Sequence, residues 1–116
     1  MSYSVLLFNP AMKTLASNRY ELDAVKPPAL EPQAVTVFLQ RLERYGYSFT
    51  GRSPAGEEFT KPVRGATVVV LVGSSEISFS ASSEPAIFEA LQDASELTDR
   101  GDLALFNPQE GSWLEA

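Results

Sequence analysis

Three carboxylates stand at a spacing that brings them onto one side of a helix. Glu89, Asp93 and Glu96 are four and three residues apart, and residues at these separations are neighbours on a helical surface. Such a group can supply oxygen ligands to a hard divalent cation, or it can form an acidic patch that attracts a basic protein. A solvated helix face explains the same spacing, because like charges there repel by only about 0.2–0.5 kcal/mol per pair. We take the group as a candidate partner surface and predict no metal site from it.

The residue types that are missing limit the chemistry further. The 116 residues include no Cys and no His, which excludes thiolate and imidazole zinc sites, iron–sulfur clusters, disulfides and every Ser-His-Asp or Cys-His mechanism. Carboxylates, Lys, Tyr, Ser and Thr remain as catalytic groups, but the sequence holds no pair of acids in an identifiable geometry. We therefore predict no catalytic residue and no cofactor, and we expect a binding protein rather than an enzyme.

The net charge of −6 is concentrated in the second half of the chain. Residues 66–116 contain nine acids and one base, whereas residues 1–65 contain six acids and eight bases. Nucleic acid and anionic lipid surfaces repel such a chain, so neither is expected as a partner. The acidity either keeps the protein soluble or presents an acidic surface to a basic protein. In the second case Glu89, Asp93 and Glu96 would steer the partner, and Trp113, the only Trp, would anchor it or else pack at the rim of the core.

The beginning of the chain gives an expectation about location. The apolar run 3–8 is too short for the core of a signal peptide and lacks a basic flank. No stretch approaches the length of about 20 apolar residues that a membrane-spanning helix needs. A cytoplasmic protein without membrane contact is expected.

Hydrophobic periodicity predicts the elements that carry these residues. One helix begins at Pro32 and ends at Gly46, and a second begins at Ser82 or Ser83 and ends before Gly101. The second helix has a predicted buried stripe of Ile87, Ala90, Leu91, Ala94 and Leu97, with the three carboxylates on its far side. Strands are predicted at 3–8, 47–50, 57–61, 66–72, 76–80, 103–106 and 112–114, and a further short one at 19–25.

This order of elements predicts a single α+β domain over residues 1–116, with two helices packed on a mainly antiparallel sheet. A ferredoxin-like βαββαβ arrangement with extra strands is the simplest match. One feature conflicts with it, because 66–72 is apolar on both faces and should be central, whereas that arrangement places it at an edge. The extra strands at 47–61 resolve the conflict if they pair with 66–72.

The apolar second face of the predicted sheet needs a cover that the two helices cannot supply. The segment 9–30, the hairpin of Trp113 or a second copy of the chain would each serve, so a homodimer is one expectation. An alternative function follows from this, in which a homodimeric domain binds a small ligand or substrate between the sheet and residues 9–30. Arg19, Tyr20 and Arg52 are its candidate ligand contacts, because they lie in irregular segments.

The C-terminal third also resembles known proteins. Ile87-Phe-Glu-Ala-Leu leads to Gly101-Asp-Leu-Ala-Leu-Phe-Asn-Pro-Gln-Glu-Gly-Ser-Trp113, which is similar to the tail of small uncharacterised bacterial α+β proteins, where a helix, a strand, an Asp/Asn-Pro-Gln turn and a closing strand follow one another. Some of those proteins are placed among toxin-immunity-like families. The resemblance covers residues 87–113, and it implies a bacterial origin and a non-enzymatic role as an inhibitor or immunity-like protein.

Overall fold

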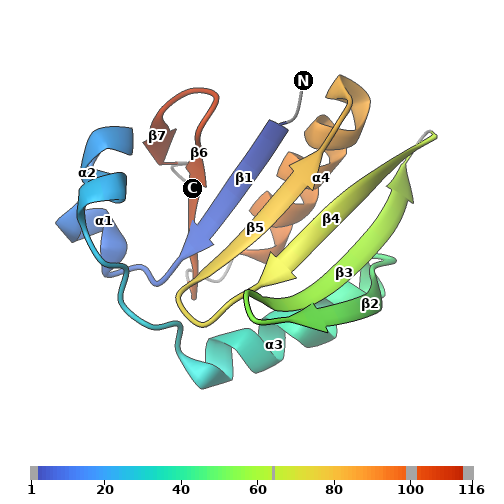
Figure 1. The fold of residues 1–116 in the computed structure, drawn as a ribbon, viewed down its shortest axis with the longest axis horizontal. Coiled ribbons are helices and arrows are strands. Elements are labelled where there is room, and N and C mark those ends of the chain that lie inside the picture. Colours follow the sequence, from blue (N-terminus) through green and yellow to red (C-terminus); the bar gives the residue numbers. More distant parts are fainter. Residues whose placement is uncertain (1–2, 64, 99–101, 114–116) are drawn as a thin grey trace.

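The computed structural model describes residues 3–63, 65–98 and 102–113, apart from the side chains of Arg19 and Asp23. Within these residues the chain forms seven strands and four helices (Figure 1). The strands are β1 (Tyr3–Phe8), β2 (Ser48–Ser53), β3 (Gly56–Val63), β4 (Ala66–Val72), β5 (Glu76–Ala81), β6 (Ala104–Asn107) and β7 (Ser112–Trp113). The helices are α1 (Met12–Leu15), α2 (Arg19–Ala24), α3 (Pro32–Arg44) and α4 (Glu84–Leu97).

All seven strands belong to one antiparallel sheet with the order β2-β3-β4-β5-β1-β6-β7. The predicted α+β class and antiparallel sheet are therefore confirmed. The specific ferredoxin-like βαββαβ arrangement is not supported, because the sheet has seven strands and its overall order differs from that of the four-stranded arrangement. The extra strands expected at 47–61 do pair with the strand 66–72. With β3 on one side and β5 on the other, β4 is an internal strand, as its apolar sequence requires.

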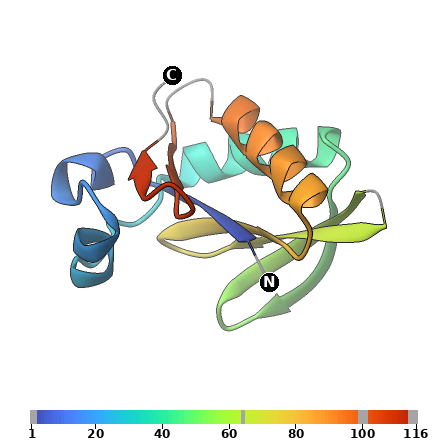
Figure 2. The same cartoon turned by 90° about the horizontal axis from the view of Figure 1, so that it is seen from above.

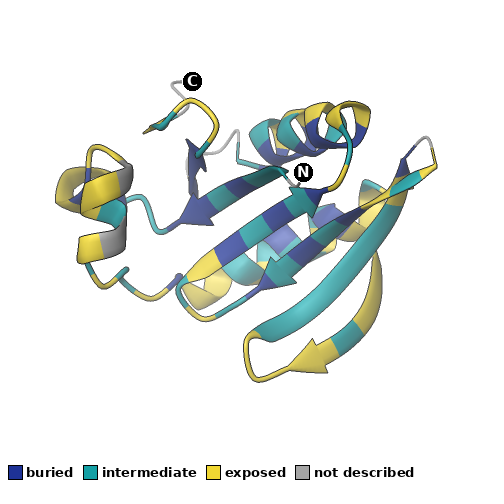
Figure 3. Ribbon diagram, turned by 45° about the horizontal axis from the view of Figure 1, so that its top comes forward, coloured by how far each residue is buried: buried dark blue, intermediate teal, exposed yellow. Residues whose placement is uncertain are grey.

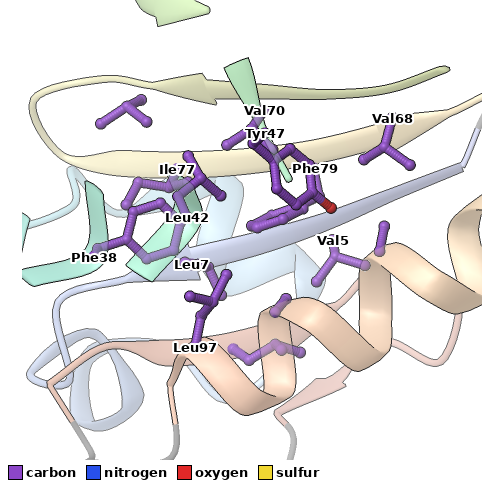
Figure 4. Packing of buried hydrophobic residues seen from close by; sticks show 14 of the residues in the cluster. Val5, Leu7, Phe38, Leu42, Tyr47, Val68, Val70, Ile77, Phe79 and Leu97 are labelled. Carbon is purple, nitrogen blue, oxygen red and sulfur yellow. The ribbon is translucent and has the colours of Figure 1, made fainter. Parts of the chain in front are cut away.

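Helices α3 and α4 lie on one face of the sheet and bury the main core against it (Figure 2). The inward residues of β4 and β5 alternate with half-exposed ones, so that Val68, Val70, Ile77 and Phe79 are completely buried. Figure 4 shows these side chains together with Phe38 and Leu42 of α3 and Leu97 of α4. The ring of Phe79 makes edge-to-face contacts with Phe38 and Tyr47. This layer fixes α4 relative to the strands.

The opposite face is covered at one end only. Met12 and Ala16, from α1 and the residue that follows it, pack with Phe8 and Phe106 into a second cluster, to which Leu22 of α2 and Trp113 add. Of the three covers that the sequence left open, the segment 9–30 and Trp113 together cover β1 and β6. No described element covers β4 on this face, because Val69 and Leu71 are half-exposed there.

The structure also corrects the short strand predicted at 19–25. These residues form α2 instead, and the side chain of Asn18 accepts a hydrogen bond from the backbone N–H of Glu21 at 3.0 Å. A capping side chain of this kind satisfies one of the donors that the first helical turn leaves without a partner. The apolar residues Leu22 and Val25 stand three residues apart, which fits a helix, and both pack on the second cluster.

Candidate functional site

The helix α4 begins where the sequence predicts. Ser83 is its N-cap and accepts a hydrogen bond from the backbone N–H of Ala86, and Pro85 stands in the first turn. At the other end Arg41 of α3 donates to the backbone carbonyls of Leu97 and Glu96 at 3.2 and 2.8 Å. The last carbonyls of a helix lack the N–H donors of a following turn, so the guanidinium helps to satisfy the C-terminus of α4. Both ends of the helix are therefore held in place.

The three carboxylates that the sequence groups together have different environments. Glu96 is exposed, Glu89 is half-buried, and Asp93 is buried with only 6% of its surface exposed. The predicted single acidic face is therefore wrong for Asp93. This side of α4 is packed against Tyr47 and Lys61 of the β2–β3 region, which the local sequence cannot indicate.

Asp93 is the centre of a polar network inside the structure. Its Oδ2 accepts a hydrogen bond from the Tyr47 hydroxyl at 2.9 Å and another from the Lys61 Nζ at 2.9 Å. Lys61 also forms an ion pair with Glu89 at 3.2 Å, and its Nζ lies 5.2 Å from the centre of the Tyr47 ring. Each charge in the network therefore has an opposite charge or a hydrogen bond, which is the condition for tolerating a buried carboxylate.

The pKa values of the two partners reflect this network. Burial by itself lowers the pKa of Lys61, but hydrogen bonds and Coulombic attraction from Asp93 and Glu89 outweigh it, so the pKa lies above its ordinary value. Burial, followed by the negative charge and hydrogen bond of Asp93, raises the pKa of the Tyr47 hydroxyl far above its ordinary value. Lys61 therefore stays charged and Tyr47 stays neutral at physiological pH, and both roles are structural.

Trp113 is also a structural residue. Its indole N–H donates to the carbonyl of Ala16 at 2.9 Å, and its ring meets Phe8 and Phe106 edge-to-face at centroid distances of 5.9 and 5.2 Å. The ring thus joins the segment 9–30 to the strands β1 and β6. Of the two readings of this residue, packing at the core rim is the one that the contacts support.

A stripe of exposed residues remains on α4 and forms the candidate site. We call Glu84, Phe88, Gln92 and Glu96 the outer face of α4; they stand four residues apart, and all are exposed. Phe88 is 64% exposed, which is the highest value of any described Phe. Glu84 and Glu96 have no ion-pair partner among the described residues. A large apolar ring therefore projects into solvent between two free carboxylates.

Phe88 is not among the residues predicted from the sequence, although a signal for it is present there. The residue stands outside the buried stripe of α4, on the polar side of an otherwise amphipathic helix. An aromatic residue at such a position gains little from folding, because most of its surface stays in water.

The residues chosen for the alternative ligand site do not come together. Tyr20 is 89% exposed on α2, and Arg52 lies on β2 at the far edge of the sheet, where it pairs with Glu57 at 3.4 Å. The side chain of Arg19 lies outside the described residues. A groove of about 160 Å³ does lie between β1 and Pro27, but its lining includes none of the three. This volume is small for an organic ligand, since such pockets usually have about 300–1,000 Å³.

Neither a metal site nor a membrane helix is found in the described part of the chain. No three of its Asp and Glu side chains are grouped so that they could hold a metal ion. None of its helices is long and apolar enough to cross a membrane. A scan of family models, a search of curated proteins and a search of solved structures found no match to this chain.

Proposed function

We propose that this protein is a binding module that engages a basic protein partner through the outer face of α4. The observation that carries the proposal is the exposure of Phe88, at 64%, between the free carboxylates of Glu84 and Glu96. Aromatic anchors surrounded by polar residues are typical of protein interfaces. The binding role is that expected from the sequence, but with Phe88 in place of Trp113 and without a direct contact from Asp93.

The two kinds of residue have separate tasks in this proposal. Burial of the Phe88 ring in a pocket of the partner contributes about 1.5–3 kcal/mol of binding free energy. Glu84, Glu89 and Glu96, which are exposed or half-buried, accelerate association with a partner of opposite charge. The expected partner surface is therefore an apolar pocket bordered by Lys and Arg. An inhibitor or immunity-like role is implied by the resemblance of residues 87–113 alone and stays a prediction.

Site-specific crosslinking tests the proposal in cells of the source organism. A photoreactive phenylalanine analogue at position 88 keeps an aromatic ring on the outer face and captures whatever binds there. The same analogue at position 20 is the matched control, because Tyr20 is 89% exposed on the other side of the sheet. We expect an adduct from position 88 and none from position 20.

Charge reversal then tests the specificity of the adduct. Glu84→Lys together with Glu96→Lys should abolish crosslinking from position 88, and added salt should weaken it, because both remove the electrostatic attraction. The proposal is contradicted if position 88 gives no adduct, if position 20 gives the same adduct, or if charge reversal leaves the yield unchanged.

A further inference from the structure

The strand β2 is an open edge of the sheet. It pairs only with β3 among the described elements, and five of its six residues are exposed (Figure 3). An edge strand presents backbone N–H and C=O groups that another strand can use. The side chains along this edge therefore decide which strand can pair with it.

A β-bulge in β2 places an aromatic and a cationic side chain on the same face of the sheet. Phe49 stands opposite Phe59, whereas Arg52 stands opposite Glu57, and the register shifts between positions 49 and 51. Residues 57 and 59 of β3 point to the helix-covered face, so their partners on β2 do so as well. Phe49 is 53% exposed, and the side chain of Arg52 is 74% exposed.

A groove next to this edge has residues suited to bind an arginine side chain. It has a volume of about 460 Å³ and lies between α3 and the β2–β3 hairpin. Phe49 and Phe59 stand edge-to-face with ring centroids 5.6 Å apart, and the carboxylate-bearing residue Glu43 lies on the α3 side. A guanidinium is attracted both by aromatic faces and by a carboxylate.

We propose that the occupant is Arg52 of a second copy of this chain, bound through antiparallel pairing of β2 with β2. If Phe49 of one copy stands opposite Arg52 of the other, two-fold symmetry repeats the same contact on the second side. In both copies Thr50 and Gly51 lie between Phe49 and Arg52. Each strand therefore has two residues between the paired positions, and the bulge does not break the register. The guanidinium of each copy then lies at the groove with Phe49 and Glu43 of the other.

The same features exclude most other strands. A bulge and a charged residue on an edge normally discourage pairing with an arbitrary chain. In this sheet the edge is self-complementary. Arg52 discourages other strands, but the groove lined by Phe49, three residues away on the same edge, can bind the Arg52 of a second copy. This interface uses a different part of the molecule from the outer face of α4 and does not depend on the proposed function.

Disulfide trapping tests the register directly, because the chain has no cysteine of its own. The proposed pairing places Ser48 of one copy opposite Ser53 of the other. Ser48→Cys with Ser53→Cys should therefore give a covalent dimer under mild oxidation. Within one chain these residues are about 16 Å apart at about 3.3 Å per residue, which is too far for a bridge. Each single variant should stay monomeric on a non-reducing gel, since like positions are separated by the same distance.

Sedimentation equilibrium of the unmodified protein provides the second measurement. Its molar mass should rise with concentration from 12.6 kDa toward twice that value. Phe49→Ala and Arg52→Ala should each move this rise to concentrations about tenfold higher, whereas Lys13→Ala, an exposed cation on α1, should leave it unchanged. The proposal is overturned if the unmodified protein stays at 12.6 kDa throughout, or if the single cysteine variants crosslink as well as the double one.

Discussion

At the scale of single residues, Asp93 links three elements of the fold. Its carboxylate holds Tyr47, which precedes β2, and Lys61 of β3 against α4 through two hydrogen bonds of 2.9 Å. Both donors are largely shielded from solvent, because Tyr47 is 2% exposed and the Lys61 side chain is 18% exposed. Loss of the shared acceptor would leave both donors without their strongest partner, and an unmet buried donor is costly.

Asp93→Ala should therefore lower the free energy of unfolding by about 1.5–3 kcal/mol, the range for hydrogen bonds to a charged group. Glu96→Ala is the matched control on the same helix and should change stability by less than about 0.5 kcal/mol, because Glu96 is exposed. Urea denaturation measures both values. Equal effects from the two variants would show that the network does not stabilise the fold.

The same network makes stability sensitive to alkaline pH. The pKa values of Tyr47 and Lys61 are raised from ordinary values of 10.0 and 10.5. Above about pH 10 the unfolded chain loses these protons while the folded protein keeps them. The stabilisation from both groups is therefore fully present below this range and decreases as the pH rises. The free energy of unfolding falls by at most about 1.4 kcal/mol per pH unit for each group. Tyr47→Phe should flatten the fall measured by urea denaturation between pH 9 and 11. Tyr20→Phe, at an 89% exposed position, should leave the slope unchanged.

At the scale of elements, the β2–β3 hairpin depends on one glycine. Gly56 begins β3 with φ +141°, and a Cβ there would collide with the backbone carbonyl of Val72. Gly51 in the neighbouring strand is different, because its φ is not positive and nothing lies within 4 Å of a Cβ placed there. The β2–β3 hairpin therefore tolerates a side chain at Gly51 but not at Gly56. This hairpin also positions Tyr47, Phe49 and Arg52.

Gly56→Ala should lower the unfolding free energy by more than about 1 kcal/mol, because the backbone must leave its positive φ and the strand must move. Gly51→Ala should change it by less than about 0.5 kcal/mol. Thermal unfolding followed by circular dichroism measures both. A larger loss for Gly51→Ala than for Gly56→Ala would contradict this account of the hairpin.

At the scale of the whole molecule, Trp113 joins two distant parts of the chain. The hydrogen bond from its indole to Ala16 spans 97 residues of sequence. Asn9 closes the same segment from the other side, since its amide donates to the carbonyl of Ala29 at 2.9 Å. Residues 12–25 therefore pack on the sheet through the small second cluster and the Trp113 hydrogen bond, whereas α3 and α4 bury the larger main core.

Trp113→Ala should accordingly lower the unfolding free energy by less than the roughly 3–5 kcal/mol typical of a fully buried Trp, because the residue is half-buried. It should also speed amide exchange in α1 and α2 more than in β4 and β5. Trp113→Phe keeps an aromatic ring but loses the hydrogen bond to Ala16, so its cost should be about 0.5–1.5 kcal/mol. Hydrogen exchange measured by mass spectrometry separates the two effects. Uniform acceleration over the whole chain would show that the segment is not a separate unit.

The features that depend on neighbouring residues follow from the local sequence. The helices α3 and α4 begin within a residue or two of their predicted starts, because a proline in the first turn and a Ser cap act locally. The turn after β6 also follows the sequence, since the side chain of Asn107 accepts a hydrogen bond from the backbone N–H of Gln109 at 3.1 Å. The apolar residues on both faces of β4 likewise predicted an internal strand.

How these elements use their side chains depends instead on tertiary contacts. Asp93 has the spacing of a surface carboxylate, but Lys61 and Tyr47 from a distant hairpin bury it. Residues 19–24 fold as a helix, because Asn18 caps it and Leu22 packs on the second cluster. A bulge that no local pattern predicts places Arg52 on the same face of the sheet as Phe49. Burial and pairing are set by segments far apart in the chain, so the free energy that fixes them is absent from any local stretch of sequence.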